Sequence, residues 1–344
     1  MRTLNEQMRR AGRVEYPNLV MPWIPGMDDV LRARTIVSRH LPRTPLIHLP
    51  AFAETHGFNL WLKAELVLPT GSFKVRGGLN FMAQLPEELS RHGVVTASTG
   101  NHGQSIAYAA RAAGVKATIF VPEAANSIKI ASMRRMGADV RLEGRDFFES
   151  CEAMEAFAQH SHAYRVHPAN EPAIVAGVAT YALEIFEDLP DVDAIFVAVG
   201  GGSGLSGVTI ARDALKPATR LFGAQSVGAP AAYESWKARE LKKLDRMETF
   251  AEGIATREAF DLPARIFWDK VDEIVLVSDT DIKKSMLTTL EQARIVAEGA
   301  GAAALAAAIA KREELRGSNV VCVASGGNVT TNALKQIMDE EQPW

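Results

Sequence analysis

The feature that most constrains the fold is a regular alternation of short apolar strands with helices. Strands are predicted at 94–97, 117–121, 139–142, 194–199, 220–224, 273–277 and 320–324. Helices are predicted between or after them at 104–113, 127–136, 147–160 and 280–290. Strands that alternate with helices form parallel sheets. The sequence therefore predicts an α/β protein with twisted, mainly parallel sheets flanked by helices. Its 344 residues are too many for one simple core, so we expect two domains.

Four loops follow predicted strands and are rich in small or polar residues. We call them the lysine loop (69–78), the asparagine loop (98–103), the glycine loop (200–207) and the serine loop (325–328). Ligands of open parallel sheets bind outside the carboxyl ends of the strands. We therefore expect the four loops to converge on one site.

The lysine loop places Lys74 between a predicted strand at 59–65 and a helix over 78–85, with Ser72 as the expected N-cap. The helix dipole disfavours a positive charge at this end, which suggests a use for the amine. It could bind a phosphate, or it could form a Schiff base with a carbonyl if burial lowers its pKa. A solvated surface lysine is the structural alternative.

The glycine loop has five glycines in eight residues and is followed by a predicted helix to about residue 215. Bare backbone N–H groups and a helix dipole make a cradle for an anion, and a phosphate suits it best. Gly202, Gly204 and Gly207 fit the GxGxxG pattern, but Gln225 stands near the place where a dinucleotide fold has an acidic residue. A tight turn needed only for packing is the alternative.

The remaining two loops offer polar side chains. Ser98, Thr99 and Asn101 could hold a carboxylate or a ring hydroxyl, although such a segment is more often an ordinary capped turn. Ser325 follows a buried strand and could cap a helix or offer its hydroxyl to a ring nitrogen.

Composition excludes several classes of function. The net charge of −3 gives no reason to expect a nucleic-acid or anionic-membrane partner. Cys151 and Cys322 lie far apart, so reduced cytosolic thiols are expected, with Cys322 in a buried strand. The most apolar long segment, 299–310, is too short to cross a bilayer and is expected to be a helix against a sheet. The eight histidines form no metal-ligand pattern, and no GxSxG elbow is present.

Four motifs in this order resemble the pyridoxal-phosphate-dependent serine/threonine dehydratase family, which has the tryptophan-synthase-β (fold type II) architecture. They are Ser-Phe-Lys-Val-Arg-Gly at 72–77, Ser-Thr-Gly-Asn-His-Gly-Gln at 98–104, the glycine loop and Ser-Gly-Gly-Asn at 325–328. The resemblance covers about residues 28 to 338. It implies a large domain that binds pyridoxal 5′-phosphate (PLP), formed by 1–93 and 171–344, and a small substrate-side domain at 94–170.

The resemblance also implies residue roles. Lys74 would form the Schiff base with PLP and then act as the base at the α-hydrogen, and Phe73 would pack near the cofactor. Asn101 would bond the 3′-hydroxyl, and Ser325 would face the pyridine nitrogen. The phosphate would lie on Gly200, Gly201, Gly202, Ser203 and Gly204. The substrate carboxylate would lie on Ser98, Thr99, Asn101 and His102.

The reaction implied is α,β-elimination from L-threonine or L-serine, which gives a 2-oxo acid and ammonia. Thr99 stands where serine racemases of this family carry a second base, which weakens a racemase. Gln225 and Ala231 stand where some members carry metal-binding carboxylates, so we expect no metal. The chain leaves no room for the regulatory domain of the biosynthetic enzymes, so isoleucine feedback is not expected. The family suggests a cytoplasmic homodimer.

Other functions stay open from the sequence alone. The same chemistry could act on hydroxyaspartate, phenylserine or a diamino acid. A catalytically silent protein that binds a phosphate ligand is the non-enzyme alternative, and a dinucleotide oxidoreductase would leave Lys74 idle. Glu252 and Glu298 are candidate carboxylates of the site, although a solvated or structural acid is the more common role. Residues 165–180 and 226–260 are expected to contribute to the side-chain pocket.

Overall fold

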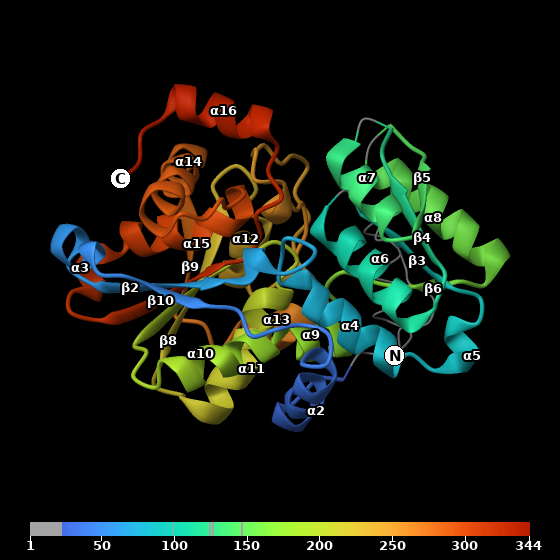
Figure 1. Ribbon diagram of the computed structural model, residues 1–344, viewed down its shortest axis with the longest axis horizontal. Helices are drawn as coiled ribbons and strands as arrows, with labels where there is room; N and C mark the ends of the chain where they lie inside the picture. The colour runs from blue at the N-terminus through green and yellow to red at the C-terminus, as the bar shows by residue number, and fades with distance from the viewer. Residues whose placement is uncertain (1–22, 99, 124, 126, 146) are drawn as a thin grey trace.

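The computed structural model describes residues 23–344 except 99, 124, 126 and 146, and it contains two sheets with helices on their faces (Figure 1). The strands are β1 (Leu46–Leu49), β2 (Asn59–Ala64), β3 (Val94–Ala97), β4 (Ala117–Val121), β5 (Asp139–Leu142), β6 (Tyr164–Arg165), β7 (Ala194–Ala198), β8 (Arg220–Ser226), β9 (Glu273–Val277) and β10 (Asn319–Ala324). The helices of its first part are α2 (Met27–Val37), α3 (Ala51–His56), α4 (Lys74–Gln84), α5 (Glu87–Ser90), α6 (Asn101–Ala113), α7 (Ser127–Arg135), α8 (Phe147–Ser161), α9 (Pro172–Val178) and α10 (Thr180–Asp188). Those of the second part are α11 (Ser203–Leu215), α12 (Ala231–Ala238), α13 (Asp261–Phe267), α14 (Asp279–Thr288), α15 (Gly299–Ala310) and α16 (Thr331–Glu340).

The larger sheet has the strand order β1-β2-β10-β7-β8-β9, and only β1 runs antiparallel to its neighbour. One apolar core contains α14 and α15, and another contains α10, α11 and α13, so the two helix groups cover opposite faces (Figure 1). Strands buried on both faces read as continuous apolar runs, which explains why β7 and β10 are clear in the sequence. The alanine-rich α15 is buried almost throughout, as its composition predicts.

The smaller sheet has the order β5-β4-β3-β6 and is parallel throughout. Helix α8 packs on β3 and β4 in a core of its own, while α6 belongs to the main core. Figure 1 shows this sheet and its helices on the right, with α4 between it and the larger sheet. The domain bounds of 1–93 with 171–344, and 94–170, stay a prediction.

Most elements lie where the alternation predicts them, but two helices begin earlier. Helix α4 begins at Lys74 rather than near residue 78, and α6 begins at Asn101. Ser72 was the wrong choice of N-cap, because Phe73 holds that position and makes no side-chain capping bond. The reason is tertiary: the Phe73 N–H donates to the Ser325 carbonyl at 3.1 Å, so a neighbouring loop takes up this donor.

Three absences can be stated for the described part of the chain. Within it, no helix is both long and apolar enough to span a membrane. No group of three or more histidine, cysteine or acidic side chains there is arranged to hold a metal ion. Cys151 and Cys322 form no disulfide, and Cys322 lies buried in β10 as predicted.

Candidate active site

The lysine loop and the serine loop are joined by their backbones. They follow β2 and β10, which are parallel neighbours in the larger sheet. Phe73 N–H donates to the Ser325 carbonyl at 3.1 Å, and Gly327 N–H donates to the Gly71 carbonyl at 2.9 Å. The carboxyl ends of the two strands therefore bring together segments that are about 250 residues apart in the sequence.

The Lys74 amine points to the start of the helix that follows the glycine loop. Its Nζ donates to the Ser203 Oγ at 2.9 Å. The residue as a whole keeps some surface open to solvent, but dense packing around the amine lowers its pKa from 10.5 to about 8. A desolvated ammonium loses hydration energy, so a larger fraction of the amine is neutral near neutral pH than in an ordinary lysine. Lys74 is therefore a far better nucleophile and base near neutral pH than a surface lysine.

The glycine loop needs glycine at several positions for steric reasons. Gly202 is the N-cap of α11 and has a φ of +90°, a backbone conformation that other residues rarely adopt. A Cβ at Gly200 would lie 2.4 Å from the Gly253 carbonyl oxygen. Gly201 lies in the turn before α11, and Ser203 and Gly204 are the first two residues of that helix. Since the free N–H groups at the start of a helix attract anions, the loop suits a phosphate placed next to Lys74.

The asparagine loop meets the serine loop through Asn101. The Asn101 Nδ2 donates to the Glu298 Oε1 at 2.5 Å, and the Asn328 Nδ2 donates to the Asn101 Oδ1 at 2.7 Å. Ser98 Oγ accepts from the N–H groups of Gly100 and Gly103, at 3.3 and 3.0 Å, so it caps the start of α6. Thr99 lies outside the described residues.

Two buried histidines lie near the Lys74 amine. Burial, and then the charge of Lys74, lower the pKa of His102 to about 3, and the same causes lower that of His167 to about 3. Both rings are therefore neutral at physiological pH. His102 Nε2 is buried without a hydrogen-bond partner, while His167 Nδ1 accepts from the backbone N–H groups of Ala169 and Asn170. An orphaned polar atom at such a place points to a ligand that would satisfy it.

Sequence reasoning missed His167, because a lone histidine between a short strand and a helix has no pattern to mark it. Glu298 was only a candidate carboxylate, and the structure places it, buried, against Asn101. Burial raises the pKa of Glu298, against the opposing effects of Lys129 and Asn101. Glu252, the other candidate, is largely exposed and pairs with Lys129.

The structure shows what surrounds Ser325 and Phe73, the residues predicted to contact the cofactor. Ser325 is buried, and its Oγ donates to the Ala300 carbonyl at 3.2 Å. The Phe73 ring lies edge-on to Tyr181 at a centroid distance of 6.0 Å, and Lys74 Nζ lies 5.1 Å from the Phe73 centroid. Gln225 has a structural role, since its Oε1 accepts from the Tyr233 N–H at 2.9 Å.

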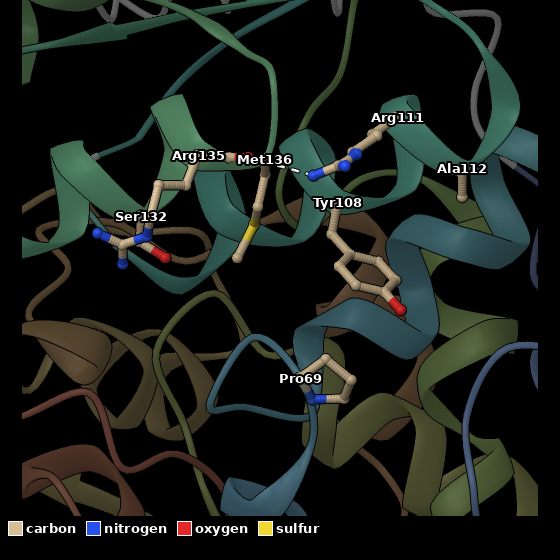
Figure 2. A pocket seen from close by; sticks show the side chains of 7 residues that line it. All are labelled: Pro69, Tyr108, Arg111, Ala112, Ser132, Arg135 and Met136. Carbon is tan, nitrogen blue, oxygen red and sulfur yellow. Dashed lines mark hydrogen bonds between the residues drawn. The ribbon is translucent and has the colours of Figure 1, made fainter.

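Two cavities lie around these loops. A small one of about 110 Å³ is lined in part by Glu298, Asn328 and Ala300, so it borders the Asn101 cluster. A larger one of about 640 Å³ lies between Pro69 and residues of α6 and α7, including Arg111 and Arg135 (Figure 2). The larger cavity contains none of the residues predicted to act in the site, so size alone does not locate the chemistry.

Comparisons with known proteins agree with this geometry. A family model described as "Pyridoxal-phosphate dependent enzyme" matches residues 37–326. An L-threonine ammonia-lyase of Thermotoga maritima is 39% identical, over 91% of this chain and 78% of the relative. A processed threonine deaminase from Solanum lycopersicum has 28% identity and a TM-score of 0.86, over 95% of this chain and 93% of the other. Maize serine racemase has 29% identity and the same TM-score of 0.86, over 92% of this chain and 99% of the other. These likenesses confirm the α/β class and its relation to PLP enzymes.

Proposed function

Because this chain belongs to the family of pyridoxal-phosphate-dependent enzymes, we propose that it is an ammonia-lyase acting on L-threonine and L-serine. It removes water from the amino acid by α,β-elimination, and hydrolysis of the product gives a 2-oxo acid and ammonia. The observation that carries the proposal is the Lys74 amine, 2.9 Å from the hydroxyl of Ser203 at the start of α11. Relatives named L-threonine ammonia-lyase support the choice of substrate.

The residues present fit PLP by their chemistry. An aldehyde needs an amine with a lowered pKa, which Lys74 offers. A phosphate needs anion-binding backbone, and Gly200, Gly201, Gly202, Ser203 and Gly204 would provide it. Two further groups fit its ring: Asn101 would bond the 3′-hydroxyl, and the Ser325 hydroxyl would face the ring nitrogen, with Phe73 packed nearby.

When bound, PLP supplies an electron sink for the pair left at the α-carbon of the substrate. The protein must then place a base, hold the carboxylate and keep the leaving group in reach. Lys74 takes the α-proton at Nζ, because about half of its amine is neutral near pH 8. Ser98, Thr99, Asn101 and His102 would hold the substrate carboxylate next to it. Since His102 and His167 are neutral, neither adds a positive charge that would lower the pKa of Lys74 further.

Racemisation of serine is a second candidate, because the chain is similar over 92% of its length to maize serine racemase. The sequence argues against it, since Thr99 replaces the serine expected as the second base. Chiral analysis of L-serine after incubation separates the two activities. D-serine formed at a rate comparable to 2-oxo acid would favour the racemase.

We also propose that the protein is a homodimer that works in the cytoplasm. The support for the dimer is the family resemblance, and the support for the compartment is that Cys151 and Cys322 form no disulfide. Light scattering would measure the mass in solution. A mass of one chain at micromolar concentration would contradict the dimer.

The direct test of function is a panel of β-hydroxy amino acids with 2-oxo acid release as the readout. We expect L-threonine and L-serine to react fastest, and Lys74→Ala to lower kcat by roughly a thousandfold or more because the base is lost. The matched control is Lys116→Ala, an exposed lysine outside the four loops, which should keep full activity. Faster release from hydroxyaspartate or phenylserine would reassign the substrate. No release from any substrate, with PLP still bound, would favour the silent binder.

A further inference from the structure

Four buried charged residues form one hydrogen-bonded cluster around Arg76 in the first turn of α4. They are Lys63 on β2, Glu65 just after β2, Arg76 on α4 and Glu184 on α10, and none is more than 7% exposed. Arg76 lies only two residues after Lys74, within the first turn of the same helix. We call these four residues the buried ion cluster.

Arg76 joins both acids of the cluster with geometry typical of strong charged hydrogen bonds. Its Nε and Nη2 donate to the two carboxylate oxygens of Glu65, at 2.7 and 2.9 Å. Its Nη1 and Nη2 donate to the two oxygens of Glu184, at 2.7 and 3.0 Å. Bidentate pairing of this kind fixes direction as well as distance. Arg76 therefore sets where the start of α4 lies relative to α10.

The cluster is electrically balanced, with two positive and two negative side chains. Lys63 Nζ donates to Glu184 Oε2 at 2.6 Å, and Thr44 Oγ1 donates to Glu65 Oε1 at 2.6 Å. Burial alone would lower the pKa of Arg76, but Glu65 and Glu184 outweigh it and raise the pKa above its usual value. Buried ion pairs stabilise a fold little compared with apolar residues of the same size, because desolvation offsets the attraction. A buried ion cluster of this kind is therefore better explained by a role in fixing one arrangement of the helices than by a role in stability.

The same helix that carries Glu184 also reaches the rest of the site. One turn earlier, the Tyr181 hydroxyl donates to the Gly204 carbonyl at 3.0 Å, and the Tyr181 ring meets Phe73 edge-on. Arg76 Nη1 lies 3.3 Å from the hydroxyl of Thr180, at the start of α10. Helix α10 is thus in contact with the lysine end of α4 and with the glycine loop.

We propose that Arg76 is a positioning residue, which locks the first turn of α4 to α10 and so holds the Lys74 amine at the Ser203 end of the glycine loop. The inference rests on the proposed function, since that function requires a lysine in this position. Placement errors of about an ångström cost on the order of a hundredfold in rate. Lys74 sits one turn or less from Arg76, so a tilt of α4 would move the amine directly.

The test compares three variants of the cluster with one control. Arg76→Lys keeps the positive charge but loses the bidentate hydrogen bonds, and Arg76→Met removes both the charge and the hydrogen bonds. Arg76→Met combined with Glu65→Gln leaves only the neutral Lys63–Glu184 pair, so it avoids an unpaired buried charge and protects folding. The control is Arg212→Met, another buried arginine, whose guanidinium binds the Thr219 and Lys270 carbonyls at the far end of α11. The unfolding temperature of each of these four variants measures its loss of stability separately from its activity.

Two readouts separate positioning from stability. The first is the pH profile with which an amine-reactive reagent labels Lys74 in the apoprotein, measured by peptide mapping. The second is a set of three constants: the Kd of PLP, the kcat for L-threonine per bound cofactor, and the KM for L-threonine. We expect the Arg76 variants to shift the labelling profile above pH 8 and to lower kcat by roughly tenfold to a hundredfold, with a smaller change in KM. The titratable groups that lie near Lys74, His102 and His167, are the same in every variant.

We expect Arg212→Met to lower the unfolding temperature and leave the labelling profile, the Kd and kcat unchanged. The proposal is overturned if the Arg76 variants lose stability only, and keep the wild-type labelling profile, Kd and kcat. Failure of the proposed function looks different, because the wild type would then release no 2-oxo acid. In that case the labelling profiles alone still show whether Arg76 places the amine.

Discussion

At the scale of single residues, the unusual feature is a lysine whose amine is forced toward neutrality. Ordinary lysine has a pKa of about 10.5, whereas Lys74 has one of about 8 because its surroundings are desolvated. The folded protein therefore binds this proton less tightly than the unfolded chain does. Stability contributed by Lys74 is lowest below pH 8 and rises as the pH increases toward 10.5. The site thus gives up stability to gain a reactive amine.

Lys74→Met should accordingly stabilise the apoprotein. We expect a gain of at most about 3 kcal/mol at neutral pH, since a lowered pKa of this size corresponds to about that much free energy. The gain should shrink as the pH rises from 8 toward 10.5 and vanish above 10.5, where the lysine is neutral in both states. Urea unfolding at about pH 7 and about pH 10 would measure it, with exposed Lys116→Met as the control. An unchanged or lower stability of Lys74→Met at pH 7 would contradict the desolvated amine.

At the scale of elements, the site depends on how closely α15 approaches the serine loop. A Cβ at Gly301 would lie 2.1 Å from the carbonyl oxygen of Gly326, so only glycine allows this contact. Glu298, the N-cap of α15, binds Asn101 from the same end of the helix. Moving α15 outward would therefore disturb both the serine loop and Asn101.

Gly301→Ala should weaken PLP binding and lower stability. Overpacking of this kind costs about 1–3 kcal/mol, and the serine loop is the part that must shift. Titration of the apoprotein with PLP, followed by visible absorbance, gives the Kd. Gly26→Ala is the control, because a Cβ at Gly26 meets nothing within 4 Å. A wild-type Kd in Gly301→Ala would show that the close approach is not needed for binding.

The elements also show what a sequence can and cannot predict. Strands such as β7 and β10 are readable, because burial on both faces makes them continuously apolar. The start of α4 was misplaced, because its first N–H group finds a partner in the distant serine loop rather than in a local cap. Helices α9 and α10, in and after the segment 165–180, were not predicted from the sequence, and the structure shows them buried nearly all round. Glu184 was missed because its partners, Lys63 and Arg76, are distant in the sequence. His167 was missed because no pattern marks a lone histidine.

At the scale of the whole molecule, two sheets and the helix between them bring four loops together. The lysine and serine loops are joined by backbone bonds, Lys74 reaches Ser203, and Asn101 meets Asn328. The places of the four loops after predicted parallel strands predicted this meeting, whereas no sequence pattern indicated the buried ion cluster. This arrangement places the Lys74 amine next to the anion-binding glycine loop, as the proposed chemistry requires.

The most direct measurement is borohydride reduction of the protein loaded with PLP, followed by peptide mapping by mass spectrometry. Reduction makes the link between cofactor and amine permanent, so the modified residue can be read from the peptide masses. We expect a single pyridoxyl group per chain on the peptide that contains Lys74, and none on the Lys74→Ala variant. A label on another lysine, or no label despite bound cofactor, would contradict the account.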